Sequence, residues 1–325
     1  MTDNQAVWQR GRVSAVAEAA EGIARIEITT ERAHRAPPGA HIDMRIPGGD
    51  TRSYSIVHGS PDGRSVTLGV RRSPTSRGGS AHVHSLRPGD DVEVTGPLQN
   101  FPLRVGADRY VLVAGGIGIT AIAGMAAVLA RLGADYHLHY VGRSRRVMAF
   151  LDELSALHGE RITVYANDGG GQLDLAGIVD DIRGADADTE LYMCGPIRLM
   201  DETRRRWMGA GLPVTNLRYE TFGNSGWFDP EPFEVVIPSL DFRTIVGASE
   251  TILGALERGG CDVMSDCRRG ECGLCELAVV EVSGDIDHRD VFFSEQQKAS
   301  AKSLCACVSR VIGAGSAAVL TLEKP

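Results

Sequence analysis

Five cysteines near the C-terminal end of the sequence have the residue type and spacing for redox chemistry: Cys267, Cys272, Cys275, Cys305 and Cys307. The first three follow the pattern C-x4-C-x2-C, which is the plant-type spacing of a [2Fe–2S] cluster. Such a cluster needs four converging thiolates, so a tight loop must supply three and a distant strand the fourth. Glycines at positions 270 and 273 let this loop turn its amides toward sulfur. The spacing leaves Cys305 and Cys307 as alternatives for the fourth ligand.

Zinc and disulfide bonds are the competing interpretations of these cysteines. Structural zinc sites usually pair two short C-x2–4-C knuckles, whereas here one triplet stands against a remote single residue. Seven cysteines in 325 residues are few and odd in number, and the polar start MTDNQAVWQR does not resemble an export signal. An iron–sulfur cluster is therefore favoured. Because such a cluster carries one electron at a time, we expect the rest of the chain to supply electrons to it.

The composition indicates a multidomain globular protein. The 325 residues suggest more than one domain, and 43% of them are hydrophobic. No apolar run reaches the roughly twenty residues of a membrane helix, because glycines interrupt the longest one, at residues 110–132. A net charge of −8 argues against a nucleic-acid partner. We expect a soluble cytoplasmic protein without a membrane partner, in a compartment whose reduced thiols suit cluster assembly.

Hydrophobic patterning divides the chain into three segments. Residues 7–105 contain short alternating runs separated by Gly and Pro turns, which is typical of an antiparallel β-barrel or a sandwich. Residues 110–222 alternate buried strands with helical stretches, which predicts an open α/β sheet with its ligands at the carboxyl ends of the strands. An exposed linker at residues 223–232 precedes a compact α+β unit that holds the cysteines. We place the domains at residues 1–105, 106–228 and 229–325.

Two motifs in the first segment suit a flavin. In R-S-Y-S, at residues 52–55, an arginine can meet a phosphate, a tyrosine can stack beside the isoalloxazine, and serines can reach the ring edge. In R-G-G-S, at residues 77–80, glycine amides and a helix N-terminus form an anion site. Taken alone, an ordinary strand and a basic surface loop are the alternatives. The candidate flavin-binding residues are Arg52, Ser53, Tyr54, Ser55, Gly69, Arg71, Arg77, Gly78, Gly79 and Ser80.

Two motifs in the second segment suit a nicotinamide nucleotide. A-G-G-I-G-I-T, at residues 114–120, follows a buried strand and opens a helix, so its backbone can approach a pyrophosphate. C-G-P, at residues 194–196, ends a later strand at the same crevice, although a cysteine there is also typical of a core. Basic residues at 143–146 suit a 2′-phosphate or are simply solvated, which leaves NADH and NADPH both open. The candidate residues are Gly115, Gly116, Gly118, Thr120, Arg143, Ser144, Cys194, Gly195 and Pro196.

In this order, the three sets of motifs resemble those of the phthalate dioxygenase reductase family, to which vanillate demethylase reductases are related. The resemblance covers essentially the whole chain and extends to Y-E-T-F-G at 219–223, D-H-R-D at 287–290 and C-V-S-R at 307–310, while Ala121 replaces the family's usual proline. It implies a ferredoxin-reductase-like antiparallel β-barrel that binds FMN, an α/β domain that binds NADH, and a β-grasp plant-type ferredoxin domain. It also implies that the cluster ligands are Cys267, Cys272, Cys275 and Cys307.

The resemblance implies an NADH-dependent oxidoreductase that passes electrons through FMN and [2Fe–2S] to a separate Rieske-type aromatic oxygenase or demethylase. Flavin is the cofactor that accepts a hydride and releases electrons singly. FMN is favoured over FAD, since the barrel has no evident adenosine-binding extension. Cys194, Ser55 and Phe222 are the expected catalytic residues, with Phe222 as a shield of the flavin face. A cytochrome P450 is the alternative recipient, and a redox-sensing binding module is the alternative class.

Overall fold

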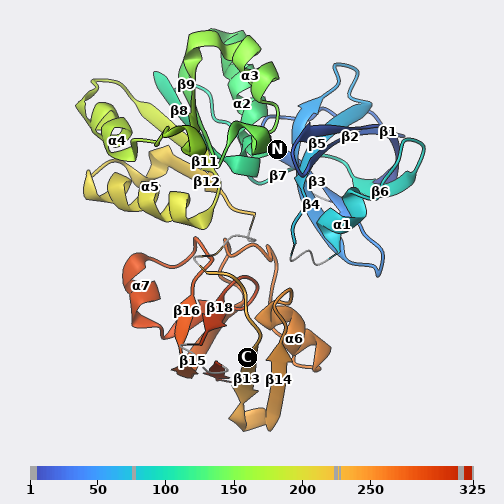
Figure 1. The fold of residues 1–325 in the computed structure, drawn as a ribbon, viewed down its shortest axis with the longest axis vertical. Coiled ribbons are helices and arrows are strands. Elements are labelled where there is room, and N and C mark those ends of the chain that lie inside the picture. The colour runs from blue at the N-terminus through green and yellow to red at the C-terminus, as the bar shows by residue number, and fades with distance from the viewer. Residues whose placement is uncertain (1–5, 75–77, 223–225, 227, 314–317, 324–325) are drawn as a thin grey trace. The chain divides into compact units, whose positions relative to one another are not determined.

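The computed structural model describes residues 6–74, 78–222, 226, 228–313 and 318–323. The chain forms two compact units (Figure 1). The first consists of Met1–Gly195 with Glu202–Glu220, and the second of Pro196–Asp201 with Thr221–Pro325. The first unit contains both the predicted barrel and the predicted α/β sheet, so the border expected between residues 105 and 106 falls inside it. The three domain boundaries therefore stay a prediction.

The N-terminal part of the first unit is a closed antiparallel barrel. Its sheet has the order β4-β5-β2-β1-β6-β3-β7, and a further pairing of β4 with β3 closes it. Alternation of apolar residues explains the strands: in β2, Ile26 and Ile28 point inward and are fully buried. The elements are β1 (Trp8–Ala20), β2 (Ile23–Thr30), β3 (Ala40–Arg45), β4 (Thr51–Gly59), β5 (Ser65–Arg71), α1 (Gly79–Val83), β6 (Asp91–Thr95) and β7 (Leu98–Gln99).

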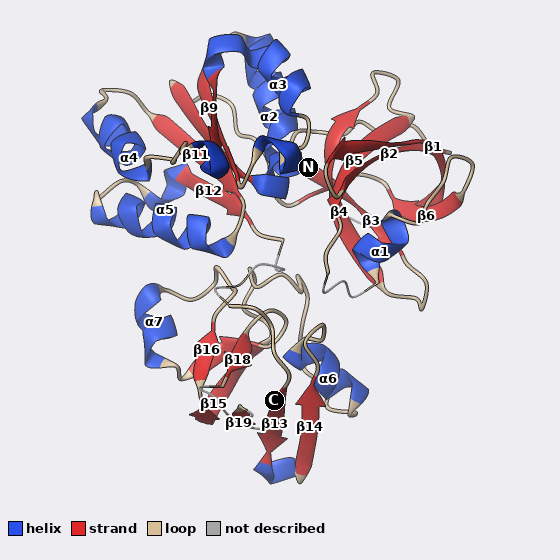
Figure 2. Cartoon of the chain, in the orientation of Figure 1, coloured by secondary structure: helices blue, strands red, loops and turns tan. Residues whose placement is uncertain are grey.

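The rest of the first unit is built on a parallel sheet with the order β10-β9-β8-β11-β12. Helices lie on both sides of it, as Figure 2 shows. From β8, the strands β9 and β10 are added on one side, and β11 and β12 on the other. Open α/β sheets form their ligand crevice at such a reversal of strand order, here between β8 and β11. The strands are β8 (Arg109–Gly115), β9 (Asp135–Gly142), β10 (Ile162–Ala166), β11 (Thr189–Cys194) and β12 (Leu217–Glu220). The helices are α2 (Ile119–Leu132), α3 (Leu151–His158), α4 (Leu175–Gly184) and α5 (Ile197–Gly209).

The second unit is an α+β fold around a mixed sheet of the order β14-β13-β19-β15-β17, beside a two-stranded sheet of β16 and β18. Helix α6 is capped by the Thr251 hydroxyl, and Ser294 forms a capping box at the start of α7. Phe233, Leu256 and Leu320 belong to the core of this unit. Its elements are β13 (Phe233–Ile237), β14 (Phe242–Val246), α6 (Ile252–Arg258), β15 (Glu276–Ser283), β16 (Asp285–Asp287), α7 (Glu295–Ser300), β17 (Ser303–Cys305), β18 (Arg310–Ile312) and β19 (Val319–Leu322).

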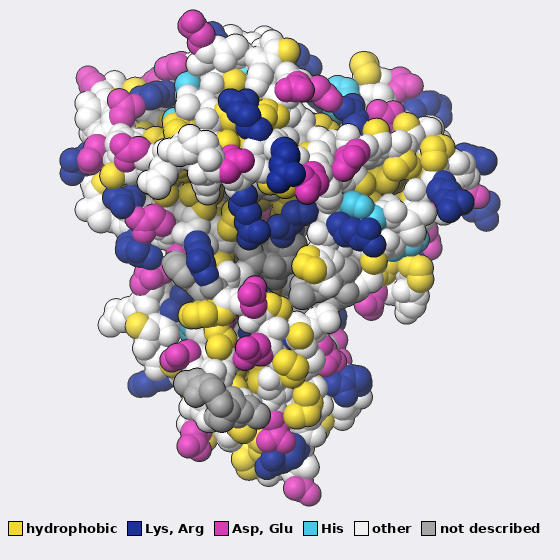
Figure 3. All heavy atoms as spheres, viewed as in Figure 1, with side chains coloured by type: hydrophobic (Ala, Val, Ile, Leu, Met, Phe, Trp, Pro, Cys, Tyr) yellow, Lys and Arg dark blue, Asp and Glu magenta, His cyan; other side chains and the backbone are white. Residues whose placement is uncertain are grey.

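Charged side chains of both signs are interspersed over the face of each unit that Figure 3 presents. Neither Lys and Arg nor Asp and Glu form a continuous field on that face of either unit. Within the described ranges, no helix combines the length and the hydropathy needed to cross a membrane.

The parallel sheet carries a histidine that we expect to make the fold sensitive to acid. Burial, with smaller effects from the charges of His137 and Arg109, lowers the pKa of His139 to about 4. Its Nδ1 lies 3.0 Å from the Tyr165 hydroxyl. The folded state favours the neutral ring, so this residue's stabilisation is complete above about pH 6.5 and is lost as the pH falls toward 4.

The free energy of unfolding of the wild type should fall between about pH 7.5 and pH 5. We expect this fall to be about 1–2 kcal/mol smaller in His139→Gln. Urea unfolding at the two pH values measures the difference. His58→Gln, which removes an exposed histidine on β4, is the control. An equal acid loss in the wild type and in both variants would contradict the prediction.

Candidate functional site

The cysteine loop between α6 and β15 aims backbone amides at sulfur. The amides of Arg269, Glu271 and Cys272 all donate to Sγ of Cys267, each at 3.4 Å. Gly270, with a φ of 77°, allows this turn. A Cβ on it would also lie 2.7 Å from a Val308 methyl carbon, so the position has no room for a side chain. Three converging amides stabilise negative charge on sulfur, which is what a thiolate ligand requires.

Four of the five cysteine thiols lie together. The Cys307 thiol hydrogen-bonds with the sulfurs of both Cys267 and Cys275, whereas Cys305 reaches only Cys275. These bonds lower the pKa of Cys267 to about 4 and of Cys275 to about 3, and the pKa values of the two donors rise. Cys272 is exposed, and no three His, Cys, Asp or Glu side chains among the described residues are arranged to hold a metal ion. The amides and the four grouped thiols fit a cluster, whereas the side chain of Cys272 lies outside this group.

The two predicted flavin motifs come together in the barrel. A Cβ on Gly79, in α1, would lie 2.8 Å from Cγ of Arg52 and 2.9 Å from the Tyr54 hydroxyl, both on β4. That hydroxyl is buried, has no hydrogen-bond partner among the described residues, and burial raises its pKa to about 12. Gly78 precedes α1 with a φ of 90° and leaves the helix without a side-chain cap. An unpaired hydroxyl beside a glycine turn fits a polar ligand such as a flavin phosphate or ring edge.

The remaining flavin candidates divide among several places. Ser53 donates to Asp43 at 2.6 Å, and Ser80 accepts the amide of Ser73 at 3.1 Å. Arg52 pairs with Asp50 on the same side of the barrel. Arg77 lies outside the described residues, and its role stays a prediction.

The glycine run of the second segment lies at the end of β8, where the order of the strands in the parallel sheet reverses. Gly115 ends β8, the 3-10 turn η1 (Gly116–Gly118) follows, and α2 begins without a side-chain cap. Cys194 ends the neighbouring strand β11, pairs with Ala114 of β8, and is fully buried. A Cβ on Gly118 would lie 2.1 Å from the Cys194 carbonyl oxygen. The two predicted nicotinamide motifs are therefore in direct contact, and the uncapped amides of α2 suit a pyrophosphate.

The end of β5 packs against this glycine turn. A Cβ on Gly69 would lie 2.8 Å from both the Phe150 ring and the Thr120 methyl carbon. Burial, and after it the charge of Arg143, lowers the pKa of Arg71. Two guanidiniums whose charges interact suit an anionic ligand.

The other basic residues at 143–146 have different environments. Ser144 is buried, Arg145 is exposed, and Arg146 pairs with Glu21 of the barrel at 2.8 Å. Arg146 is thus occupied by a protein carboxylate. Gly195 and Pro196 follow Cys194 directly, and the border between the two units falls between them.

A buried carboxylate near the flavin motif was not predicted. Glu220, at the end of β12, is 2% exposed, and the Ser55 hydroxyl donates to it at 3.5 Å. An acidic residue at the end of a strand, two positions before Phe222, was the available sequence signal. Phe222 itself is half-buried. The pair places a buried carboxylate next to a predicted catalytic serine.

The linker is only partly as predicted. Phe228 and Glu231 are exposed, as expected of a connecting segment, and residues 223–225 and 227 lie outside the described residues. Two buried arginines nevertheless hold its backbone: Arg289 donates to the Phe228 carbonyl at 3.0 Å, and Arg310 to the Glu231 carbonyl at 2.8 Å. The later part of the linker is therefore attached to the second unit.

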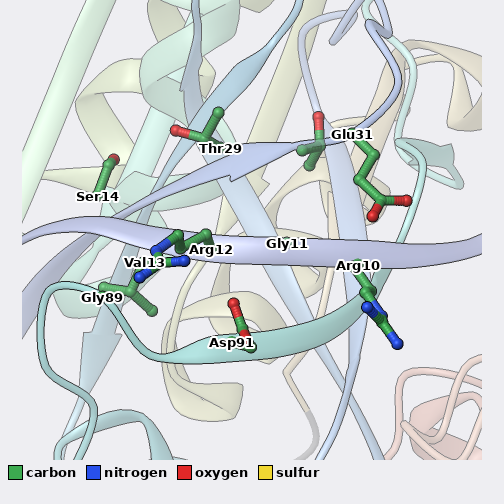
Figure 4. Close-up of a pocket in the computed structure, with 10 residues that line it drawn as sticks. Arg10, Gly11, Arg12, Val13, Ser14, Thr29, Glu31, Gly89 and Asp91 are labelled. Atoms are coloured by element: carbon green, nitrogen blue, oxygen red, sulfur yellow. The ribbon is translucent and has the colours of Figure 1, made fainter.

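A shallow open pocket lies elsewhere on the barrel, along β1 and β2 (Figure 4). Arg10, Arg12, Glu31 and Asp91 contribute side chains of both signs to it. None of the predicted site residues lines this pocket.

A barrel and an α/β sheet with the features of a flavin and nucleotide site, followed by a unit with a cluster-type cysteine loop, define an iron–sulfur reductase. Residues 240–311 match the family described as 2Fe-2S iron-sulfur cluster binding domain. The phenoxybenzoate dioxygenase subunit beta of Ectopseudomonas oleovorans is 38% identical over 308 residues, covering 92% of this chain and 93% of that protein.

Two solved structures resemble the chain. One is described as phthalate dioxygenase reductase, a modular structure for electron transfer from pyridine nucleotides to [2Fe–2S]; it has a TM-score of 0.71 and 30% identity, with coverage of 97% and 98% of the two chains. The other is an intact type IV self-sufficient cytochrome P450 monooxygenase, with a TM-score of 0.66 and 35% identity; the match covers 97% of this chain and 41% of that one. The chain thus spans about two fifths of that monooxygenase.

This chain belongs to the phthalate dioxygenase reductase family. It is an oxidoreductase with a [2Fe–2S] domain, and its relatives are components of oxygenase systems. The predicted family and the predicted multidomain fold are both confirmed.

Proposed function

We propose that this chain accepts a hydride from NADH onto FMN and delivers electrons through its [2Fe–2S] cluster to a Rieske-type aromatic oxygenase or demethylase. The observation that carries the proposal is that the predicted nucleotide motifs and the predicted flavin barrel lie against each other within the first unit. The motif at residues 114–120 of the α/β sheet contacts Cys194 through Gly118, and it contacts β5 of the flavin barrel through Thr120, whose methyl carbon lies against Gly69. A nucleotide held on that motif would have its reactive end close to a flavin held on β4 and β5.

The residues around this junction bind, orient and handle protons. The amides at the start of α2 would hold a pyrophosphate, and the small, polarizable side chain of Cys194, buried at the end of β11, would lie beside a nicotinamide ring. Tyr54 has a hydroxyl without a hydrogen-bond partner among the described residues, and the Ser55 hydroxyl donates to the buried carboxylate of Glu220. Phe222 is the candidate shield of the flavin face. Bound flavin supplies the conversion between hydride and single electrons.

The second unit holds the exit of the electron path. Cys267, Cys272, Cys275 and Cys307 are the proposed ligands, and the amides directed at Cys267 favour its thiolate form. The Cys307 thiol bonds with two of the other three, which supports Cys307 over Cys305 as the fourth ligand. Closure of the cage would require Cys272 to turn inward.

The nature of the recipient rests on the relatives. The 38% identical relative is named as a dioxygenase subunit, which favours an aromatic oxygenase. A cytochrome P450 is the second candidate, since a self-sufficient P450 contains a part that is 35% identical to this chain over 97% of its length. Both recipients take single electrons, so the reductase chemistry is the same for either.

Three measurements on the purified holoprotein test the proposal. Chromatography of the released flavin should give FMN, and FAD would refute that part. Anaerobic NADH should bleach the flavin and then the cluster, with NADPH much less effective; bleaching by NADPH alone would refute the nucleotide assignment. The reduced protein should reduce a Rieske oxygenase faster than a P450. Reduction of neither, with no steady NADH-driven turnover, would favour a redox sensor.

A further inference from the structure

Glu271 connects the cysteine loop to the strand that leads to Phe222. It stands between Gly270 and the predicted ligand Cys272. Its Oε1 accepts the backbone amide of Thr221 at 3.0 Å, and Thr221 is only 1% exposed. The two residues are 50 positions apart in the sequence, so the bond closes a long loop of chain. No role for Glu271 follows from the C-x4-C-x2-C pattern, in which it is a variable position.

The same residue also contacts the ligand set through its backbone. The amide of Glu271 donates to Sγ of Cys267 at 3.4 Å. Its other carboxylate oxygen, Oε2, lies 3.4 Å from the guanidinium of Arg269, whose amide also donates to Cys267. Both side chains are mostly buried, at 15% exposure for Arg269 and 25% for Glu271. Burial and the adjacent arginine hold the Glu271 carboxylate in one orientation. Its bond to Thr221 therefore fixes the position of the cysteine loop relative to the Thr221 backbone.

On the other side of this bond lies the end of β12. Thr221 follows Glu220, which bonds to Ser55 of the flavin barrel, and precedes Phe222, the candidate flavin shield. The Ser55 bond lies within the first unit and the Glu271 bond within the second, and one peptide bond joins them. A continuous path of covalent and hydrogen bonds therefore runs from the flavin-binding strand to the cysteine loop.

We propose that Glu271 is a positioning residue that fixes the cysteine loop to the backbone on which Phe222 lies, and that this bond sets the rate of electron transfer from flavin to cluster. The inference rests on the function proposed above. In that step one electron leaves the reduced flavin and the oxidised cluster gains it. Loss of the bond frees the loop to move relative to Thr221 and Phe222 within the second unit, so fewer molecules hold the loop against the backbone that carries the candidate flavin shield.

Glu271→Ala removes the bond, and Glu271→Gln keeps an oxygen that can accept it while removing the charge. Glu276→Ala is the matched control, because it removes an exposed carboxylate that follows Cys275 directly, at the start of β15. Three readouts apply to each holoprotein: hydrogen exchange of the Thr221 amide, the electron paramagnetic resonance spectrum of the dithionite-reduced cluster, and anaerobic stopped-flow traces that separate flavin bleaching from cluster bleaching.

We expect Glu271→Ala to exchange the Thr221 amide about tenfold faster, as loss of a hydrogen bond to a charged acceptor implies. Its cluster spectrum and its flavin reduction by NADH should match the wild type, while cluster bleaching slows about three- to tenfold, in proportion to the opened population. Glu271→Gln should restore protection and most of the rate. Glu276→Ala should resemble the wild type in all three readouts.

Several outcomes would overturn the inference. Wild-type protection of Thr221 and unchanged cluster bleaching in Glu271→Ala would show that the bond has no role. Equal slowing in Glu271→Gln, with Thr221 still protected, would assign the effect to charge. Loss of the cluster in Glu271→Ala would assign the residue to folding of the ligand loop. If NADH fails to bleach the wild-type flavin, the proposed function fails instead, and the exchange of Thr221 still tests the bond itself.

Discussion

Cys307→Ser should remove the [2Fe–2S] cluster, whereas Cys305→Ser should leave it in place. The Cys307 thiol bonds with the sulfurs of Cys267 and Cys275, and the Cys305 thiol bonds with that of Cys275 alone. The fourth ligand must face the centre of the group, and Cys307 meets that requirement. We expect Cys307→Ser to lose nearly all cluster iron and visible absorbance, because a missing thiolate leaves the cage incomplete.

The backbone explains why two cysteines so close in sequence differ. Cys305 ends β17 and pairs with Glu276 in the ladder, and its carbonyl accepts the amides of Val308 and Ser309. The amide of Ala306 is tied to the Cys275 carbonyl at 3.0 Å. Cys307 therefore stands in a tight turn over the cysteine loop, while Cys305 remains part of the sheet.

Iron content, absorbance and the paramagnetic resonance of the dithionite-reduced protein measure the outcome. Cys261→Ser is the control, since this half-buried cysteine packs against the core of the second unit and stands outside the C-x4-C-x2-C motif. If the cluster survives in Cys307→Ser and is lost in Cys305→Ser, the prediction is wrong and Cys305 is the fourth ligand. Serine is nearly isosteric with cysteine, so a change in folding should not obscure the result.

The sequence predicts those parts of the fold and site that depend on residues close together in the chain. Alternating runs indicate the barrel strands, and the continuous apolar run of β8 indicates a parallel strand, because each reflects burial along a single strand. The glycine turn and the cysteine triplet are local for the same reason. Cys305 and Cys307 stay ambiguous in the sequence because only the turn that follows β17 distinguishes them.

Partners distant in sequence escape such reasoning. Ser55 and Glu220 are 165 positions apart, and Thr221 and Glu271 are 50 apart. Neither pair leaves a periodic or composition signal, since each carboxylate is ordinary until its neighbour is known. The compact units differ from the predicted domains for a similar reason. A Cβ on Gly124, in α2, would lie 3.6 Å from the Val57 carbonyl of β4, and such close packing joins barrel and sheet into one unit.

Gly118→Ala should slow reduction of the flavin by NADH about a hundredfold or more while leaving the cluster in place. Gly118 has a φ of −58° and a ψ of −16°, which alanine adopts freely, so the effect is purely one of space. A Cβ there would lie 2.1 Å from the Cys194 carbonyl oxygen and 2.8 Å from the Gly195 amide. These are backbone atoms of the last residue of β11 and of the residue that follows it, and β11 pairs with both β8 and β12, so it cannot move without breaking the ladders.

The glycine turn must move instead, and the uncapped amides of α2 move with it. Overpacking of this kind costs about 1–3 kcal/mol of stability. A displacement of about 1 Å at a reacting geometry costs about a hundredfold in rate. We therefore expect flavin bleaching by NADH to slow by about a hundredfold or more. Transfer from dithionite-reduced flavin to the cluster should stay close to that of the wild type, because the cysteine loop belongs to the other unit.

Gly124→Ala provides the matched control, on the same helix. Its new Cβ would meet backbone atoms at 3.6 Å and beyond, which is ordinary contact, and alanine favours a helix interior by up to about 1 kcal/mol over glycine. This variant should melt at the wild-type temperature or slightly above and bleach at the wild-type rate. Stopped-flow bleaching and thermal unfolding of the three proteins measure both effects. A wild-type bleaching rate in Gly118→Ala would show that contact between the glycine turn and Cys194 does not govern how the nucleotide is held.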